Sequence, residues 1–159
     1  KGGFGWAGLK LGELVAVALV AVNALGNVRD AEGRWVAGAH IESRIFSVEE
    51  AFGLHAAAAG EDAPCENTTL GVVLTNAALT KAQAQKVASM THDAYARAIW
   101  PVHTTNDGDA IFAVASGEVE TLVDTVGALA NAAMQQAIVN GARHAESAYG
   151  LMAAADLQA

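Results

Sequence analysis

The chain has 159 residues, of which 53% are apolar and only 16% charged, and its formal net charge is −8. This length corresponds to about one domain, and the low content of charged residues predicts extensive burial or oligomerisation. The negative charge and the absence of any lysine and arginine cluster argue against nucleic acid and acidic membrane surfaces as partners, because phosphate groups are bound by basic patches.

Three further features of the composition restrict the function. The longest apolar run, residues 14–22, is too short for a membrane-spanning helix, which needs about 20 residues. Cys65 is the only cysteine, which excludes an internal disulfide and is typical of a reducing compartment, so we expect a cytoplasmic protein. The histidines are scattered without metal-ligand spacing, and we predict neither a metal nor a cofactor.

The first part of the chain predicts strands and turns. Residues 1–8 are rich in glycine, which indicates a tight turn that shapes a pocket wall. Residues 14–22 are rich in valine and predict a strand buried on both faces at the centre of a sheet, which Asn23 ends. Residues 29–38 predict a turn and a short edge strand, with Asp30 and Glu32 as solvated turn residues.

The middle of the chain predicts a short helix, a linker and a second strand. Ser47, followed by two glutamates, indicates a capped helix start. Residues 60–66 have the composition of a mobile linker, and an apolar strand begins at Leu70. Thr80 and Gln83 form a capping box, so a helix is expected from there until just before Pro101.

The last part predicts a loop over residues 101–109, a strand over residues 110–115 and a long helix from about residue 122 to residue 148. Apolar residues at helical spacing place a buried stripe on that helix, with Asn131 and Arg143 on its polar side. The order strand, strand, linker, strand, helix, strand, helix indicates an α+β fold without internal repeats.

The stretch around Asn67 and Thr68 has three interpretations. An Asn-Thr-Thr triplet at a strand entrance is ordinarily a turn, and it also fits the N-x-[ST] glycosylation pattern. The third interpretation is self-cleavage, in which the Thr68 hydroxyl attacks the Asn67 carbonyl and water opens the resulting ester. The freed threonine then carries a nucleophilic hydroxyl and an α-amine, with an ordinary pKa of about 7.7–8.0, that takes its proton.

Asp107 and Asp109 also leave alternatives open. They are two residues apart, so their carboxylates share a face in extended backbone. They are either a solvated turn, part of a calcium loop that lacks its other oxygen ligands, or a pair that orients the Thr68 hydroxyl and amine.

Several motifs in one order resemble peptidase family S58, the DmpA type of self-processing peptidase. The family contains aminopeptidases, amidases and nylon-oligomer hydrolases. The likeness covers most of the chain, including the glycine-rich residues 2–5 and the segment that ends in Asn23. Downstream it is carried by Asn67-Thr68-Thr69-Leu70-Gly71-Val72-Val73, Leu79-Thr80-Lys81, Ala96-Arg97-Ala98-Ile99, Pro101-Val102-His103-Thr104 and Asp107-Gly108-Asp109.

The resemblance implies a layered α/β/β/α sandwich of the N-terminal-nucleophile type, of which this chain is the C-terminal part. Residues 1–67 would end the α-subunit, and residues 68–159 would be the β-subunit, which begins at the nucleophile; together they form one domain. Thr68 is then the nucleophile, Asn23 donates its side-chain amide to the oxyanion, and Asp107 and Asp109 align the nucleophile. The family's activating lysine is expected upstream of Lys1.

The implied substrate is a small peptide or amide, and the implied assembly is a homo-oligomer, a tetramer of processed heterodimers. Cleavage by an aminopeptidase or amidase through an acyl-enzyme is the activity that the resemblance favours. A 6-aminohexanoate (nylon) oligomer hydrolase would use the same nucleophile. Alternatives of another class are a non-catalytic processed subunit and an acyl transferase of the ornithine acetyltransferase type.

Overall fold

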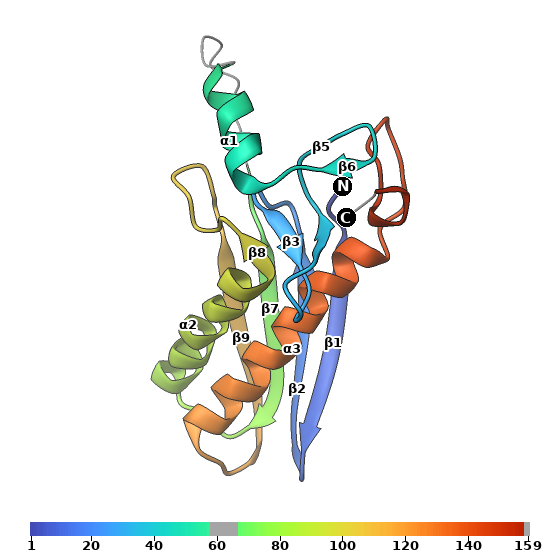
Figure 1. The fold of residues 1–159 in the computed structure, drawn as a ribbon. Coiled ribbons are helices and arrows are strands. Elements are labelled where there is room, and N and C mark those ends of the chain that lie inside the picture. Colours follow the sequence, from blue (N-terminus) through green and yellow to red (C-terminus); the bar gives the residue numbers. More distant parts are fainter. Residues whose placement is uncertain (58–66, 158–159) are drawn as a thin grey trace.

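The computed structural model describes residues 1–57 and 67–157, so the linker expected at residues 60–66 and Cys65 lie outside the described residues. A four-stranded sheet has the order β1-β2-β7-β9. Its strands are β1 (Phe4–Leu11), β2 (Leu14–Ala21), β7 (Leu70–Ala77) and β9 (Ala110–Val119). Helices α2 (Lys81–Ala98) and α3 (Val123–Arg143) cover one face (Figure 1). The expectation of an α+β fold is confirmed.

The glycine-rich start of the chain is a strand, so the prediction of a tight turn there is wrong. β1 pairs with β2 along its whole length. A Cβ atom on Gly5 would lie 2.0 Å from the Ala137 carbonyl oxygen, and one on Gly3 would lie 2.3 Å from the Gly141 oxygen. These glycines therefore allow the backbone of α3 to approach the sheet closely, rather than allowing a turn.

Strand β2 lies in the interior of the sheet, as the valine-rich run predicts. Its burial alternates, however, because one face packs against the helices while the other remains partly exposed. In the described part of the chain, the prediction that β2 is buried on both faces is therefore correct for one face only.

The unit β7–α2–β9 brings two parallel strands side by side, and parallel strands need a long crossover connection. The predicted capping box begins α2: the Thr80 side chain accepts from the Gln83 backbone, and the Gln83 side chain accepts from the Thr80 backbone. The helix ends at Ala98, before the proline, as expected. β9 runs longer than predicted.

Short elements surround the edge of this main sheet. β3 (Asn27–Arg29), β4 (Trp35–Ala37) and β8 (Ile99–Trp100) form a small sheet in the order β4-β3-β8. β5 (His40–Ile41) pairs with β6 (Arg44–Ile45), and the 3-10 helix η1 (Ala154–Asp156) follows α3. The predicted cap is present at α1 (Val48–Ala57), where Ser47 Oγ accepts from Glu50 N at 3.2 Å.

Helix α3 ends at Arg143, five residues earlier than predicted. Asn131, expected on the polar side, is only 8% exposed, and its side-chain amide donates to the Met90 carbonyl at 3.0 Å. A buried amide must find a hydrogen-bond partner, and Asn131 thereby links α3 to α2.

The second face of the main sheet carries large apolar side chains that no described element covers. Along one cross-strand row Trp6 pairs with Leu19, Leu19 with Val72 and Val72 with Phe112. Trp6 is 63% exposed and Phe112 61%. Of the four layers that the resemblance implies, the described residues thus contain one layer formed by the main sheet and one layer formed by α2 and α3. None of their helices is both long and apolar enough to cross a membrane.

Candidate functional site

The sheet topology brings the predicted site residues together. β2 is antiparallel to β7, so Asn23 at the end of β2 lies beside Thr68 at the start of β7. β9 is parallel to β7, so the loop that precedes β9 lies on the other side of Thr68. Thr68 N donates to the Asn23 carbonyl at 2.9 Å, and Asn67 forms a parallel bridge with Asp107.

The Thr68 hydroxyl lies against the peptide bond expected to be cut. Its Oγ1 donates to the Asn67 carbonyl oxygen at 2.7 Å. The same oxygen accepts the Gly108 backbone N–H at 2.9 Å. A fixed N–H aimed at a carbonyl oxygen can hold the negative charge that develops there during attack.

Two neighbours restrict which residue can react. A Cβ atom on Gly108 would lie 2.7 Å from Thr68 Oγ1, so the glycine leaves room for the hydroxyl. Thr69, the alternative hydroxyl, is completely buried, and its Oγ1 has no partner among the described residues. Only the Thr68 hydroxyl is partly exposed, and it alone combines access with contact to the Asn67 carbonyl.

The two aspartates make different contacts. The Asp109 side chain is 3% exposed; its Oδ1 accepts the Thr69 backbone N–H at 2.8 Å, and its Oδ2 lies 2.8 Å from His103 Nδ1. Asp107 Oδ2 instead accepts the Thr104 backbone N–H at 2.8 Å, within its own loop. Asp109 therefore holds the residue that follows Thr68, whereas Asp107 shapes the loop that presents Gly108.

Aromatic and imidazole rings from α2 support this loop. His92 Nδ1 lies 3.3 Å from His103 Nε2, and the His103 ring stacks on Tyr95 with centroids 5.9 Å apart. The Tyr95 hydroxyl donates to the Thr69 carbonyl at 3.2 Å. Burial lowers the pKa of His92, and the neighbouring His103 lowers it further. Burial also raises the pKa of Tyr95, so its phenol keeps its proton.

His92 and Tyr95 are absent from the residues that the sequence picks out. The one local signal is their spacing of three, which places both rings on one side of α2. The contact between these two rings and the loop before β9 depends on how α2 packs on the sheet.

Asn23, whose backbone contacts Thr68, lines a pocket of about 280 Å³. Its backbone carbonyl holds the Thr68 N–H, while its side chain is exposed. The pocket lining is mostly small and apolar and includes Gly2, Val22, Leu25 and Ala39. Asn23 is thus adjacent to Thr68, and the roles of Thr68 as nucleophile and of Asn23 as amide donor stay predictions.

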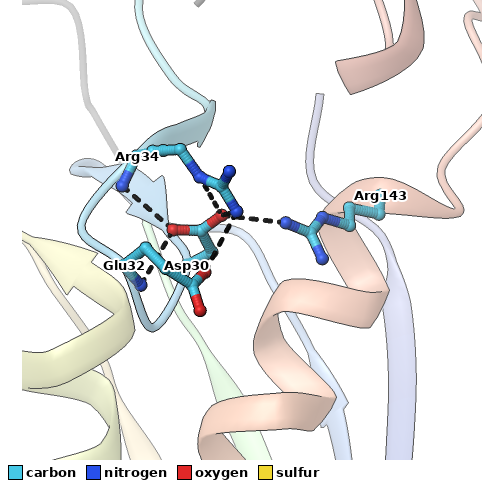
Figure 2. A network of polar contacts seen from close by, with 4 residues as sticks. All are labelled: Asp30, Glu32, Arg34 and Arg143. Carbon is cyan, nitrogen blue, oxygen red and sulfur yellow. Dashed lines mark hydrogen bonds and ion pairs between the residues drawn. The ribbon is translucent and has the colours of Figure 1, made fainter.

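A second polar cluster lies around Asp30, the residue directly after β3 of the small sheet. Asp30, predicted to be a solvated turn residue, is only 5% exposed, so that prediction is wrong. Figure 2 shows its carboxylate between two guanidinium groups, at 2.9 Å from Arg34 and 3.0 Å from Arg143. Glu32 remains exposed and pairs with Arg34 at 3.1 Å.

Residues 1–57 and 67–157 contain no group of three or more His, Cys, Asp or Glu side chains that could hold a metal ion.

The class of protein follows from fold and site together. The structure of a Burkholderia sp. beta-aminopeptidase matches with a TM-score of 0.62 and 19% identity, over 90% of this chain and 42% of that one. The L-aminopeptidase D-Ala-esterase/amidase from Ochrobactrum anthropi, described as a variant of the N-terminal-nucleophile hydrolase fold, matches with a TM-score of 0.57 and 21% identity, over 89% of this chain and 40% of that one. The chain therefore has an α+β fold of this type.

The sequence comparison identifies the family. The model described as "Peptidase family S58" matches residues 1–155, and the chain belongs to that family. An uncharacterized aminopeptidase of Mycobacterium leprae is 36% identical over 95% of this chain and 47% of the relative. A 6-aminohexanoate-oligomer endohydrolase of Agromyces sp. is 30% identical over 74% of this chain and 34% of that enzyme. The chain thus spans about half the length of the aminopeptidase and a third of the endohydrolase.

Proposed function

We propose that this chain carries the self-cleavage site and the nucleophile of an amide-bond hydrolase. One observation carries the proposal: the Thr68 hydroxyl and the Gly108 N–H both bind the Asn67 carbonyl oxygen, at 2.7 and 2.9 Å. The hydroxyl is thus in contact with the peptide group it has to attack, and an oxyanion donor is already in place. The names of the relatives, aminopeptidase and oligomer endohydrolase, both describe cleavage of amide bonds.

In the first reaction the chain cuts itself. Thr68 Oγ1 forms a bond to the carbonyl carbon of Asn67, and the negative charge on the oxygen is held by the Gly108 N–H. The bond from that carbon to the Thr68 nitrogen then breaks, and the nitrogen receives the hydroxyl proton. Water hydrolyses the resulting ester, which leaves Asn67 with a carboxylate and Thr68 with a free α-amine.

In the second reaction the freed residue attacks a substrate amide. The α-amine takes the proton from the Thr68 hydroxyl, and the hydroxyl forms an ester with the substrate acyl group. Water then releases the acid. The Asn23 side-chain amide is the proposed donor to the substrate oxyanion, a contact worth roughly 2.7–4 kcal/mol in other hydrolases. Asp109 holds the residue that follows Thr68, and Asp107 shapes the loop that presents Gly108. The proposed reaction uses no cofactor.

The proposed substrate is a small peptide or amide that enters the pocket beside Asn23. A nylon-oligomer hydrolase is the second candidate, favoured by the 30% identity to the Agromyces endohydrolase. Both activities use the same nucleophile, so the substrate pocket distinguishes them. A tetramer of processed heterodimers remains the proposed assembly.

Replacing Thr68 tests the proposal directly. The variants are made in the protein together with any natural sequence that flanks these residues. T68A should stay as one uncut chain, whereas T68S keeps a hydroxyl and should be cut. Intact mass and N-terminal sequencing show whether a chain begins at residue 68. Cleavage of T68A at this bond would exclude Thr68 as the nucleophile.

Substrate assays then separate the candidates. The processed protein is offered aminoacyl p-nitroanilides, short β-peptides and 6-aminohexanoate oligomers. Hydrolysis of the first two supports an aminopeptidase, and hydrolysis of the third supports an oligomer hydrolase. Processing without hydrolysis of any of them would indicate a non-catalytic subunit, and acyl transfer to an added amine would indicate a transferase.

A further inference from the structure

We propose that His103 is a positioning residue for self-cleavage: it holds the Asp109 carboxylate against the Thr69 backbone N–H, while His92 and Tyr95 hold His103. This inference rests on the function proposed above. His103 does not contact the peptide group that is cut, yet its replacement should change the rate of self-cleavage measurably.

The contacts form one continuous chain from α2 to the nucleophile. His92 Nδ1 lies 3.3 Å from His103 Nε2, and His103 Nδ1 lies 2.8 Å from Asp109 Oδ2. The second oxygen of the same carboxylate accepts the Thr69 N–H at 2.8 Å. His103 therefore turns the carboxylate so that its remaining oxygen meets the peptide group directly after Thr68.

The His103 imidazole is the ion-pair partner of Asp109 Oδ2. That oxygen is buried and has no partner of hydrogen-bond geometry among the described residues, and its close polar contact is the ion-pair contact with His103 Nδ1 at 2.8 Å. A buried carboxylate without compensating partners is strongly disfavoured. Without the imidazole the carboxylate would therefore rotate toward solvent, which weakens its contact with Thr69.

The Thr69 peptide groups in turn fix the orientation of Thr68. The Thr69 N–H is held by Asp109, and its carbonyl accepts from both Ala110 N and the Tyr95 hydroxyl. Thr68 N is held on the other side by the Asn23 carbonyl. Attack requires the reacting atoms within about 3–3.5 Å, and a misplacement of about 1 Å can reduce a rate 10²-fold. Loosening one of these holds should therefore slow the cut.

The backbone at His103 decides which substitutions are informative. Its φ is +56°, a conformation that glycine and asparagine adopt more readily than most residues. H103G removes the side chain without backbone strain. H103N keeps an N–H donor near the position of Nδ1 but loses the contact with His92. H103D tolerates the same φ and presents a carboxylate, not a donor, to Asp109.

The experiment compares the three variants by the rate at which a chain beginning at Thr68 appears after synthesis, followed by intact mass. H103G and H103D should be cut about tenfold to 100-fold more slowly than the wild type. H103N should recover most of the rate, and free imidazole added to H103G should restore part of it. Thermal unfolding of the uncut T68A background shows whether each variant is folded.

Each outcome bears on a different statement. If the wild-type chain is not cut, the proposed function fails, and the inference fails with it. If the wild type is cut and either H103G or H103D, folded, is cut at the same rate, the proposed function stands and the role of His103 is overturned. If H103N is as slow as H103G and imidazole has no effect, the donor to Asp109 is not the cause, and the inference is again overturned.

Discussion

Two buried carboxylates, Asp30 and Asp109, are stabilised in different ways. Asp30 accepts hydrogen bonds from the backbone of Glu32 and Arg34, and from the guanidinium groups of Arg34 and Arg143 (Figure 2). Asp109 has one backbone N–H and one imidazole. Their exposed fractions are similar, 5% and 3%, so burial alone does not distinguish the two sites.

The difference lies in the chemistry of the partners, which are two arginines at Asp30 and one histidine at Asp109. Burial alone would raise the pKa of Asp30, but the Arg34 backbone and side chain hold it below its usual value. Arginine stays protonated at any physiological pH, so Asp30 is a fixed link between the β3–β4 hairpin and the last turn of α3. Asp109 instead faces the His103 imidazole at 2.8 Å, and its other oxygen accepts the backbone N–H of Thr69, the residue after the proposed nucleophile. In our proposal the first cluster holds the fold, and the second positions Thr68 for self-cleavage.

The largest expected contrast comes from the same substitution at both positions. D109N removes the charge that pairs with His103 and should slow self-cleavage about 10²-fold through misplacement of Thr68. D30N should be cut at the wild-type rate, because its cluster makes no contact with residues 67–69. Intact mass against time measures both. Slow cutting of D30N together with normal cutting of D109N would reverse our assignment of the two clusters.

A smaller effect is expected from Gly108. G108A keeps the backbone N–H that holds the Asn67 oxygen but places a methyl group 2.7 Å from the present position of Thr68 Oγ1. The hydroxyl must rotate away from the carbonyl, and the cut should be slower by about tenfold. G53A is the matched control, because a Cβ there meets nothing within 4 Å. Equal rates for G108A and the wild type would show that the hydroxyl has room to move without loss.

Local patterns in the sequence predict much of the fold. The capping box at Thr80 and the valine-rich run of β2 give the correct element types and positions. The glycines of β1 mislead because the same residue type permits a turn or a close backbone contact, and only the position of α3 decides between them. Asp30 and Asn131 mislead for a related reason: their partners, Arg143 and Met90, are far away in sequence.

The candidate site shows the same division. The family resemblance singles out Asn23, Thr68 and Asp109, and the sheet brings side by side the strand ends at which they stand. The contact of Asp107 with its own loop cannot be read from the spacing of the aspartates, because that spacing fits a shared face equally well. His92 approaches His103 only once α2 packs on the sheet.

Thermal stability should respond to the two clusters in the opposite order from self-cleavage. D30N leaves Arg34 and Arg143 without the charge they share and weakens the link between the hairpin and α3, so its melting temperature should fall by several degrees. R143Q should lower it less, because that side chain is half exposed and Arg34 still pairs with Asp30. Differential scanning fluorimetry of both variants in the uncut T68A background measures the difference. Equal losses for the two variants would mean that Arg34 contributes little, and a larger loss for R143Q would contradict the prediction.

The smallest effect expected is a change in how stability depends on pH. Burial, followed by the nearby His103, lowers the pKa of His92 in the folded chain, so the unfolded chain binds a proton more readily below about pH 6.5. Stability contributed by neutral His92 is therefore present above that pH and decreases as the pH falls below it. Asp30 acts in a lower window: its lowered pKa stabilises the fold above about pH 3.9, and this stabilisation is lost as the pH falls through the pKa of the folded state.

Denaturant unfolding of wild type and H92F between pH 5 and 8 tests the upper window. Between pH 5 and 8 the free energy of unfolding of H92F should depend less on pH than that of the wild type, and its decrease at lower pH should be unchanged. An equal slope in both proteins would mean that His92 is as easily protonated in the folded chain as in the unfolded one.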